Sequence, residues 1–275
     1  MPLTFADLRS HWNFGDPASS RAAFETLLPA EGNEELELEI RCQIARTYGL
    51  EGKFEEGHEV LAGLSASGDP SKRSFACWNL EKGRLLNSSG KPQEAQPFFE
   101  AACLSEWDDL RIDALHMMAI VSSGEEALDW NQKALAGAEA SEMPEARRWI
   151  GSISNNLAWS LHDLGRLEEA LAGFQTAERF FAEKGGQVHH IAKWAVARCL
   201  RSLGRFEEAL AGQKALLESG DGYVEEEMGE NLHSLGRTVE ARPHFARAYE
   251  LLSQDDWLVK NEAARLERLK VLGNL

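Results

Sequence analysis

One phrase recurs along the chain and constrains its fold more than any other feature. It reads LGRLEEALAGFQTA at 164–177, LGRFEEALAGQKAL at 203–216 and LGRTVEARPHFARA at 235–248. Looser copies begin at residues 14, 51, 89 and 121, so that seven copies cover nearly the whole chain. Self-similarity at a spacing of roughly 20–50 residues is typical of stacked structural repeats. The sequence therefore predicts a stack of similar units.

Each copy has the residues of two helices joined by a tight turn. Glycine takes the left-handed conformation that ends a helix without a steric penalty, and six of the seven turn positions are glycine. Pro17 and Pro92 stand two residues later, where a helix can begin without a backbone N–H. The turn positions are Gly15, Gly52, Gly90, Ser122, Gly165, Gly204 and Gly236.

Small and bulky residues recur at fixed distances from the turn. The residue five positions after it is always small, the residue seven positions before it is usually small, and the residue nine positions after it is usually bulky. Small residues let two helix axes approach while bulky neighbours interlock around them. The bulky residues are Phe24, Leu61, Phe99, Phe174 and Phe245.

This pattern resembles the tetratricopeptide repeat (TPR) family, with the closest copy at residues 155–177. The resemblance implies an all-α fold, a right-handed superhelical solenoid of antiparallel helix hairpins, in a single domain over residues 1–275. The segment 255–272 is expected to form a capping helix in which Trp257, Leu258, Leu266 and Leu269 cover the last repeat. The seven expected repeats span approximately 3–33, 34–68, 71–106, 107–141, 144–185, 187–220 and 221–253.

Charge and composition exclude several classes of partner. The formal net charge is −16, whereas phosphate backbones and anionic membranes attract basic faces. No apolar run approaches the ~18 residues of a membrane helix, and the N-terminus does not resemble a secretory signal. The four cysteines show no close pairing, as is typical of a reducing compartment. We expect a cytoplasmic protein with no nucleic-acid partner and no membrane contact; nothing in the sequence specifies its oligomeric state.

The sequence carries no pattern typical of catalysis. It contains no P-loop, no GxGxxG after a strand, no HExxH and no GxSxG. The adjacent His189 and His190 point about 100° apart on a helix and make a poor metal site. Glutamate pairs recur at the expected helix starts, where the helix dipole favours negative charge. They therefore need no acid–base role. We expect no enzyme activity, no cofactor and no metal.

Arginine and histidine recur on the face that would bind a ligand. In TPR proteins the first helix of each hairpin lines the concave groove, so the resemblance implies that residues six positions before the turn face it. Guanidinium groups suit carboxylates and phosphates, which predicts an acidic peptide or a C-terminal carboxylate as ligand. Pairing with neighbouring acids such as Glu81 and Asp113 is the alternative. The candidates in this strip are Arg9, Arg46, Arg84 and His116, with Arg198 further along the chain.

A second candidate cluster lies in repeats five to seven. Trp, Tyr and Arg dominate binding hot spots, although packing between first helices is the alternative reading of the tryptophans. Asn156 stands nine positions before its turn, where several peptide-binding relatives carry an asparagine that grips the peptide backbone; the same position in other repeats holds Ala6, Gln43, Glu81, Asp113, Ala195 and Glu227. The cluster comprises Asn155, Asn156, Trp159, Trp194, Arg198, Arg201 and Tyr223.

These features predict a non-enzymatic protein–protein interaction scaffold. Its concave groove would hold a peptide or protein segment, possibly one with acidic character. The alternative is a ligand- or peptide-sensing regulatory module that acts through a separate effector protein.

Overall fold

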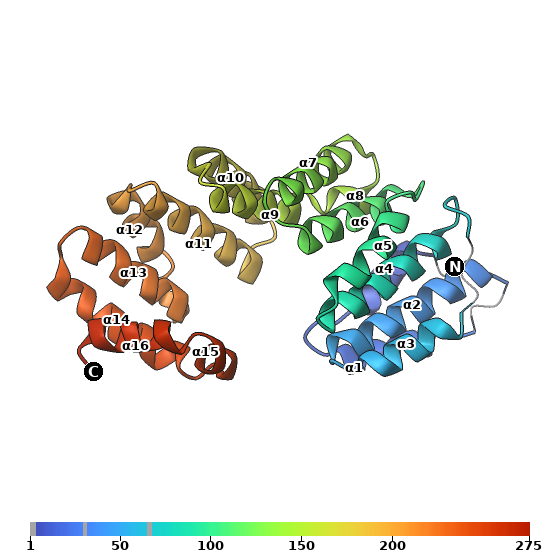
Figure 1. Cartoon of the computed structure of the whole chain (residues 1–275), viewed down its shortest axis with the longest axis horizontal. Coiled ribbons are helices and arrows are strands. Elements are labelled where there is room, and N and C mark those ends of the chain that lie inside the picture. Colours follow the sequence, from blue (N-terminus) through green and yellow to red (C-terminus); the bar gives the residue numbers. More distant parts are fainter. Residues whose placement is uncertain (1–3, 30–31, 65–67) are drawn as a thin grey trace. The chain divides into compact units, whose positions relative to one another are not determined.

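The computed structural model describes residues 4–29, 32–64 and 68–275 (Figure 1). Residues 1–3, 30–31 and 65–67 lie outside the described residues, and of these 3, 30–31 and 65–67 belong to the first two expected repeats. The regular secondary structure of the described residues is helical, without a strand. This confirms the predicted all-α helical repeat fold.

The chain divides into two compact units, Met1–Ile153 and Ser154–Leu275. The expectation of a single domain stays a prediction, and the units are described one at a time. The first unit holds η1 (Ala6–His11), α1 (Pro17–Glu25), α2 (Glu34–Leu50), α3 (Phe54–Ala62), α4 (Arg73–Ser88), α5 (Pro92–Ala102), α6 (Asp108–Val121), α7 (Gly124–Ala140), α8 (Pro144–Arg147) and the start of α9 (Ile150–Asp163).

In this unit the helices form consecutive antiparallel hairpins (Figure 1). The first helices α2, α4 and α6 pack on their partners α3, α5 and α7, and α4 packs on both α2 and α6. The first helix expected for repeat five is not continuous, because the chain leaves α8 at Arg147 and enters α9 at Ile150.

The second unit continues the same hairpin pattern. Its first helices are α9, α11 and α13, with α11 and α13 in contact. The elements after α9 are α10 (Leu167–Ala182), α11 (Gly186–Ser202), α12 (Phe206–Lys214), η2 (Leu217–Ser219), α13 (Gly222–Ser234), α14 (Thr238–Leu252), α15 (Asp256–Asn261) and α16 (Ala263–Gly273).

The turns end the first helices in one repeated way. At Gly52, φ is +74°, and the N–H of Lys53 donates to the carbonyl of Tyr48 at 2.9 Å, which closes a Schellman motif. Equivalent glycines with positive φ are Gly90, Gly165, Gly204 and Gly236. Gly15 does not share this conformation: the short η1 ends before it, and Asp16 caps α1 by accepting from the N–H of Ser19.

The substitution Gly52→Ala measures how much a side chain in this left-handed turn lowers the free energy of unfolding. A Cβ at Gly52 would have no atom within 4 Å, so only the left-handed backbone opposes the substitution. We expect a loss of about 1–2 kcal/mol in the free energy of unfolding, measured by urea titration followed by circular dichroism. Gly63 caps the other end of α3 with φ of −75°, and Gly63→Ala should be neutral or slightly stabilising. Equal losses in both variants would contradict this explanation.

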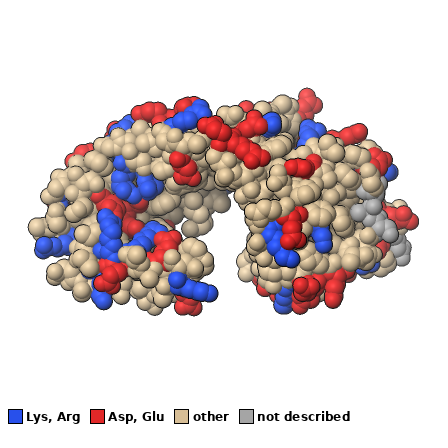
Figure 2. Space-filling view, in the orientation of Figure 1, with Lys and Arg blue, Asp and Glu red and all other residues tan. Residues whose placement is uncertain are grey.

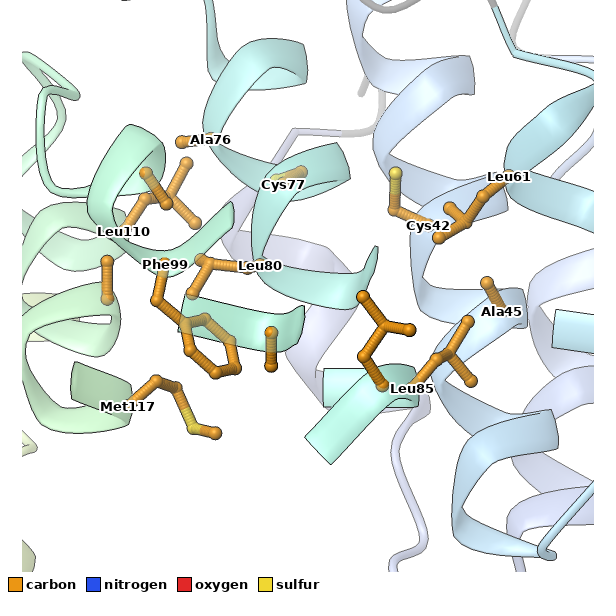
Figure 3. Close-up of a cluster of buried hydrophobic side chains, with 14 of the residues drawn as sticks. Cys42, Ala45, Leu61, Ala76, Cys77, Leu80, Leu85, Phe99, Leu110 and Met117 are labelled. Atoms are coloured by element: carbon orange, nitrogen blue, oxygen red, sulfur yellow. The ribbon is translucent and has the colours of Figure 1, made fainter. Parts of the chain in front are cut away.

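The core follows the small and bulky positions of the repeat. Phe99 of α5 is 0% exposed, and a Cβ on Gly83 of α4 would lie 2.5 Å from its ring. Gly229 and Phe245 make the same contact in the second unit. Figure 3 shows the Phe99 ring between Leu80 and Met117. The expected roles of the small and bulky positions are therefore confirmed.

The C-terminal cap differs in part from the expectation. Leu258, Leu266 and Leu269 are buried against Leu232 and Phe245, as predicted for a cap. Trp257 is 61% exposed, so its expected covering role was wrong. The predicted single helix is two, because Glu262 leaves the helical conformation with φ of −128° and ψ of 35° between α15 and α16.

Candidate functional site

Two strip arginines of the first unit, Arg46 and Arg84, lie in a chain of ion pairs that crosses the first helices. Arg46 on α2 faces Glu81 on α4, with 3.7 Å between Nη1 and Oε1. Arg84 on α4 contacts both Glu81 and Asp113 of α6. The predicted strip therefore carries acids between its bases. The intramolecular pairing that the sequence left open does occur for Arg46 and Arg84.

Because these ion pairs are buried, the charges in them interact strongly. Burial works to raise the pKa of the Asp113 carboxyl, but the positive charges of Arg84 and Arg46 outweigh it and hold that pKa below its ordinary value. Removing a single partner would leave an uncompensated charge in a buried place.

One rule of position explains which arginines are paired. Each paired arginine of the predicted strip stands six residues before its own turn, and an acid that it meets stands nine residues before the next turn. Arg46 thus meets Glu81, and Arg84 meets Asp113. In the second unit Arg198 Nε meets Glu227 Oε1 at 3.1 Å in the same way. The acids were visible in the sequence, but only the stacking of neighbouring hairpins brings them to these arginines.

The same rule explains why Arg9 has no acid. The corresponding position in the next repeat is Gln43, whose Oε1 accepts from Trp12 Nε1 at 3.0 Å. Among the described residues no carboxylate lies within the 4.0 Å ion-pair distance of Arg9, and its side chain is exposed. His116 is buried on α6, with its ring centroid 5.4 Å from that of Trp149. Burial lowers the pKa of this histidine, which favours its neutral form.

Arg148 is a half-buried arginine of the first unit that counting from the turns missed. It lies in the break between α8 and α9, where helical spacing no longer applies. Its guanidinium is 5.4 Å from the ring centroid of Trp149. The nearest sequence signal was Pro144, which marks an irregular start of this repeat.

Three aromatic rings form a row across the first helices of the second unit. The ring centroids of Trp159 on α9 and Trp194 on α11 are 6.2 Å apart, and those of Trp194 and Tyr223 on α13 are 6.4 Å apart. Both tryptophans are half-buried and Tyr223 is 36% exposed. The row is partly interhelical packing, as the alternative reading expected, and partly open surface. We call Trp159, Trp194 and Tyr223 the aromatic row.

A mixed-charge group adjoins the aromatic row. Arg198 and Arg201 share the buried carboxylate of Glu227, so two guanidinium groups compete for one acid. Burial raises the pKa of Glu227, and both arginines oppose that rise. Arg265 pairs with Glu226 and also lies 5.3 Å from the Tyr223 ring centroid. Figure 2 shows acidic and basic side chains gathered side by side in this region of α11, α13 and α16.

The two predicted asparagines lie on α9, one turn before Trp159. Both are half-buried, and Asn155 Nδ2 donates to Asn156 Oδ1 at 3.4 Å. This weak contact leaves most of their donors and acceptors available. Asn155 and Asn156 therefore extend the aromatic row with polar groups suited to a peptide backbone.

No group of three or more His, Cys, Asp or Glu among the described residues could hold a metal ion. None of their helices is both long and apolar enough to cross a membrane. Cys42 and Cys77 are free and buried, and burial raises the pKa of both thiols.

Comparison with known families agrees with this hairpin geometry. Residues 155–224 match the tetratricopeptide repeat model. They include the first helices α9 and α11 with their partners and the left-handed turns at Gly165 and Gly204. This segment of the chain belongs to the tetratricopeptide repeat family. No curated protein matches the chain.

Solved structures share the fold at low identity. The chain resembles the apo form of RapI, with a TM-score of 0.71 and 14% identity over 98% of this chain and 80% of that one. It also resembles aspartyl phosphate phosphatase F from Bacillus subtilis, with a TM-score of 0.60 and 15% identity over 97% and 76%.

A third similar structure is a Signal Transduction ATPase with Numerous Domains protein with a tetratricopeptide repeat sensor from Pyrococcus horikoshii. Its TM-score is 0.69 at 14% identity. The match covers 93% of this chain but only 42% of that protein. All three likenesses concern the fold.

Proposed function

We propose that this TPR protein is a non-enzymatic scaffold that binds a peptide or protein segment along the first helices of its second unit. The observation that carries the proposal is the aromatic row, which remains partly exposed beside Asn155 and Asn156. Partly exposed Trp and Tyr beside Arg are typical of binding hot spots. Arg198 and Arg201 share one carboxylate, so an acidic group on the ligand would find guanidinium donors within reach. The acidic character of the segment and the predicted cytoplasmic location belong to this proposal.

Selection from a random peptide library tests it, because no ligand need be known in advance. Peptides selected on the wild-type chain should bind Trp194→Ala at least about 30-fold more weakly, as hot-spot truncations cost about 2 kcal/mol. Fluorescence anisotropy of labelled peptides gives the affinities, and binding should weaken as salt screens the acidic group.

The matched control is Trp257→Ala, which removes an exposed tryptophan of the same unit outside the aromatic row. It should leave the peptide affinities unchanged. If the selected peptides bind Trp194→Ala as well as wild type, or if selection yields none, the proposal fails.

The second candidate is a sensing module that acts through a separate effector. The fold likeness to the structure described as containing a tetratricopeptide repeat sensor favours it. In that case a selected peptide should change which proteins the chain captures from a lysate of its source cell. A simple scaffold would capture the same proteins with and without the peptide.

A further inference from the structure

Two arginines of the first unit, Arg9 and Arg148, have no acid within ion-pair distance among the described residues. Within the described ranges, no carboxylate lies within 4.0 Å of the guanidinium of Arg9 or Arg148, and Arg46 has a single ion pair at the long distance of 3.7 Å. The Arg46 guanidinium also lies over two aromatic rings, 5.6 Å from the ring centroid of Trp12 and 5.8 Å from that of Phe14.

The positive charges of these three arginines act on one another. Burial lowers the pKa of Arg148, and the positive charges of Arg9 and Arg46 lower it further, against the opposing effect of Asp113 and Asp109. Burial likewise lowers the pKa of Arg46, with Arg84 and Arg9 acting in the same direction. Like charges held together at a partly buried place destabilise one another unless an anion joins them.

Buried polar atoms without a hydrogen-bond partner lie in the same region. His116 is 8% exposed and its Nδ1 has no hydrogen bond, and Trp149 Nε1 is buried without one as well. The rings of these residues are 5.4 Å apart, and Arg148 lies over Trp149. Most buried donors in folded proteins are satisfied, so these two atoms point to a polar group that belongs there.

The local charge indicates a doubly negative group. Four arginines (Arg9, Arg46, Arg84 and Arg148) surround two acids (Glu81 and Asp113), which leaves a charge of +2. In the adjoining set, Arg73 forms ion pairs with both Glu39 and Asp109, and the net charge of the three side chains is −1. A phosphate monoester carries about −1.5 to −2 near neutral pH and offers three acceptor oxygens, which suits several guanidinium forks.

We propose that Arg9, Arg46 and Arg148 form a binding site for a phosphate monoester dianion on the first unit, with His116 Nδ1 and Trp149 Nε1 as neutral donors. The site is independent of the peptide-binding proposal, because it lies in the other unit and uses none of the aromatic row.

The test measures binding of inorganic phosphate and of O-phosphoserine to the full chain. Isothermal titration and thermal unfolding at constant ionic strength provide the readouts. Wild type should bind both compounds and gain thermal stability, and acetate should bind more weakly than phosphate. The double variant Arg9→Gln/Arg148→Gln should bind phosphate at least about tenfold more weakly. Without phosphate, this variant should be as stable as wild type or more so, because it loses repulsion and orphans no acid.

Arg247→Gln is the control for net charge, since it removes one exposed arginine of the other unit; it should bind phosphate like wild type. A phosphoserine peptide that binds much more tightly than phosphoserine alone identifies a phosphorylated segment as the source, and equal affinities identify a small phosphate ester. The proposal is overturned if wild type does not bind phosphate, if acetate binds equally well, or if the double variant binds phosphate like wild type.

Discussion

Phe99→Ala should lower the free energy of unfolding by about 3–5 kcal/mol. The ring is 0% exposed and packs against Gly83 on the partner helix. The opposing glycine has no side chain with which to fill the space, so the cavity should persist and the loss should fall near the upper end of that range. Urea titration followed by circular dichroism measures it. Leu104→Ala removes a side chain of the same unit that is 65% exposed, and should change stability by no more than about 0.5 kcal/mol.

A double-mutant cycle shows whether the contact itself is responsible. In the wild-type background a Cβ at Gly83 would lie 2.5 Å from the Phe99 ring, so Gly83→Ala should cost about 1–3 kcal/mol through overpacking. In the Phe99→Ala background the same methyl group enters a cavity and adds helix propensity, so it should stabilise the chain. An unchanged cost of Gly83→Ala in the two backgrounds would refute this account of the helix pair.

Arg73→Met should cost about 3–5 kcal/mol, because it leaves two acids without their cation. Arg73 opens α4 and joins Glu39 of α2 to Asp109 of α6, at 2.9 Å in each case. Arg73 and Glu39 are 6% and 5% exposed. The guanidinium also lies 4.9 Å from the ring centroid of Trp107, so its replacement loses packing as well as charge. Chemical denaturation of both proteins over a series of pH values gives the difference.

The loss should depend on pH with a definite sign. Burial raises the pKa of Glu39 above its ordinary 4.5, although Arg73 partly opposes the rise. A raised acid pKa gives stability that is fully present below 4.5 and lost as the pH rises through the folded-state value. Removing Arg73 raises that pKa further. The deficit of Arg73→Met against wild type should therefore be largest at neutral pH and shrink on acidification.

Arg247→Met supplies the comparison, because its ion pair with Glu250 is on the surface, where pairs contribute about 0–1 kcal/mol. It should be nearly neutral at every pH. A deficit of Arg73→Met that stays constant with pH would show that lost packing, and not the uncompensated acids, causes the destabilisation.

Much of the candidate site could be placed from the sequence, but its pairing could not. Counting back from the turns located Arg46, Arg84 and Arg198 on the first helices, where the structure has them. Their acids lie 29 to 35 residues further along the chain, so no spacing within one helix reveals the contact. Arg148 was missed for a related reason, since the break between α8 and α9 ends the helical count at the position where it lies.

The sequence by itself determined the features that depend on neighbours along the chain. A glycine at the left-handed turn, a proline or acidic residue at the helix start and a small residue facing a bulky one are local requirements of a hairpin, and they recur along the chain. Tertiary structure alone decided which charges meet. It paired Arg46 with Glu81 and left Arg9 without an acid in ion-pair distance among the described residues, because the stacking of first helices brings only certain positions of successive hairpins into contact. Tertiary packing also decided the cap, where Leu258 is buried and the neighbouring Trp257 is 61% exposed.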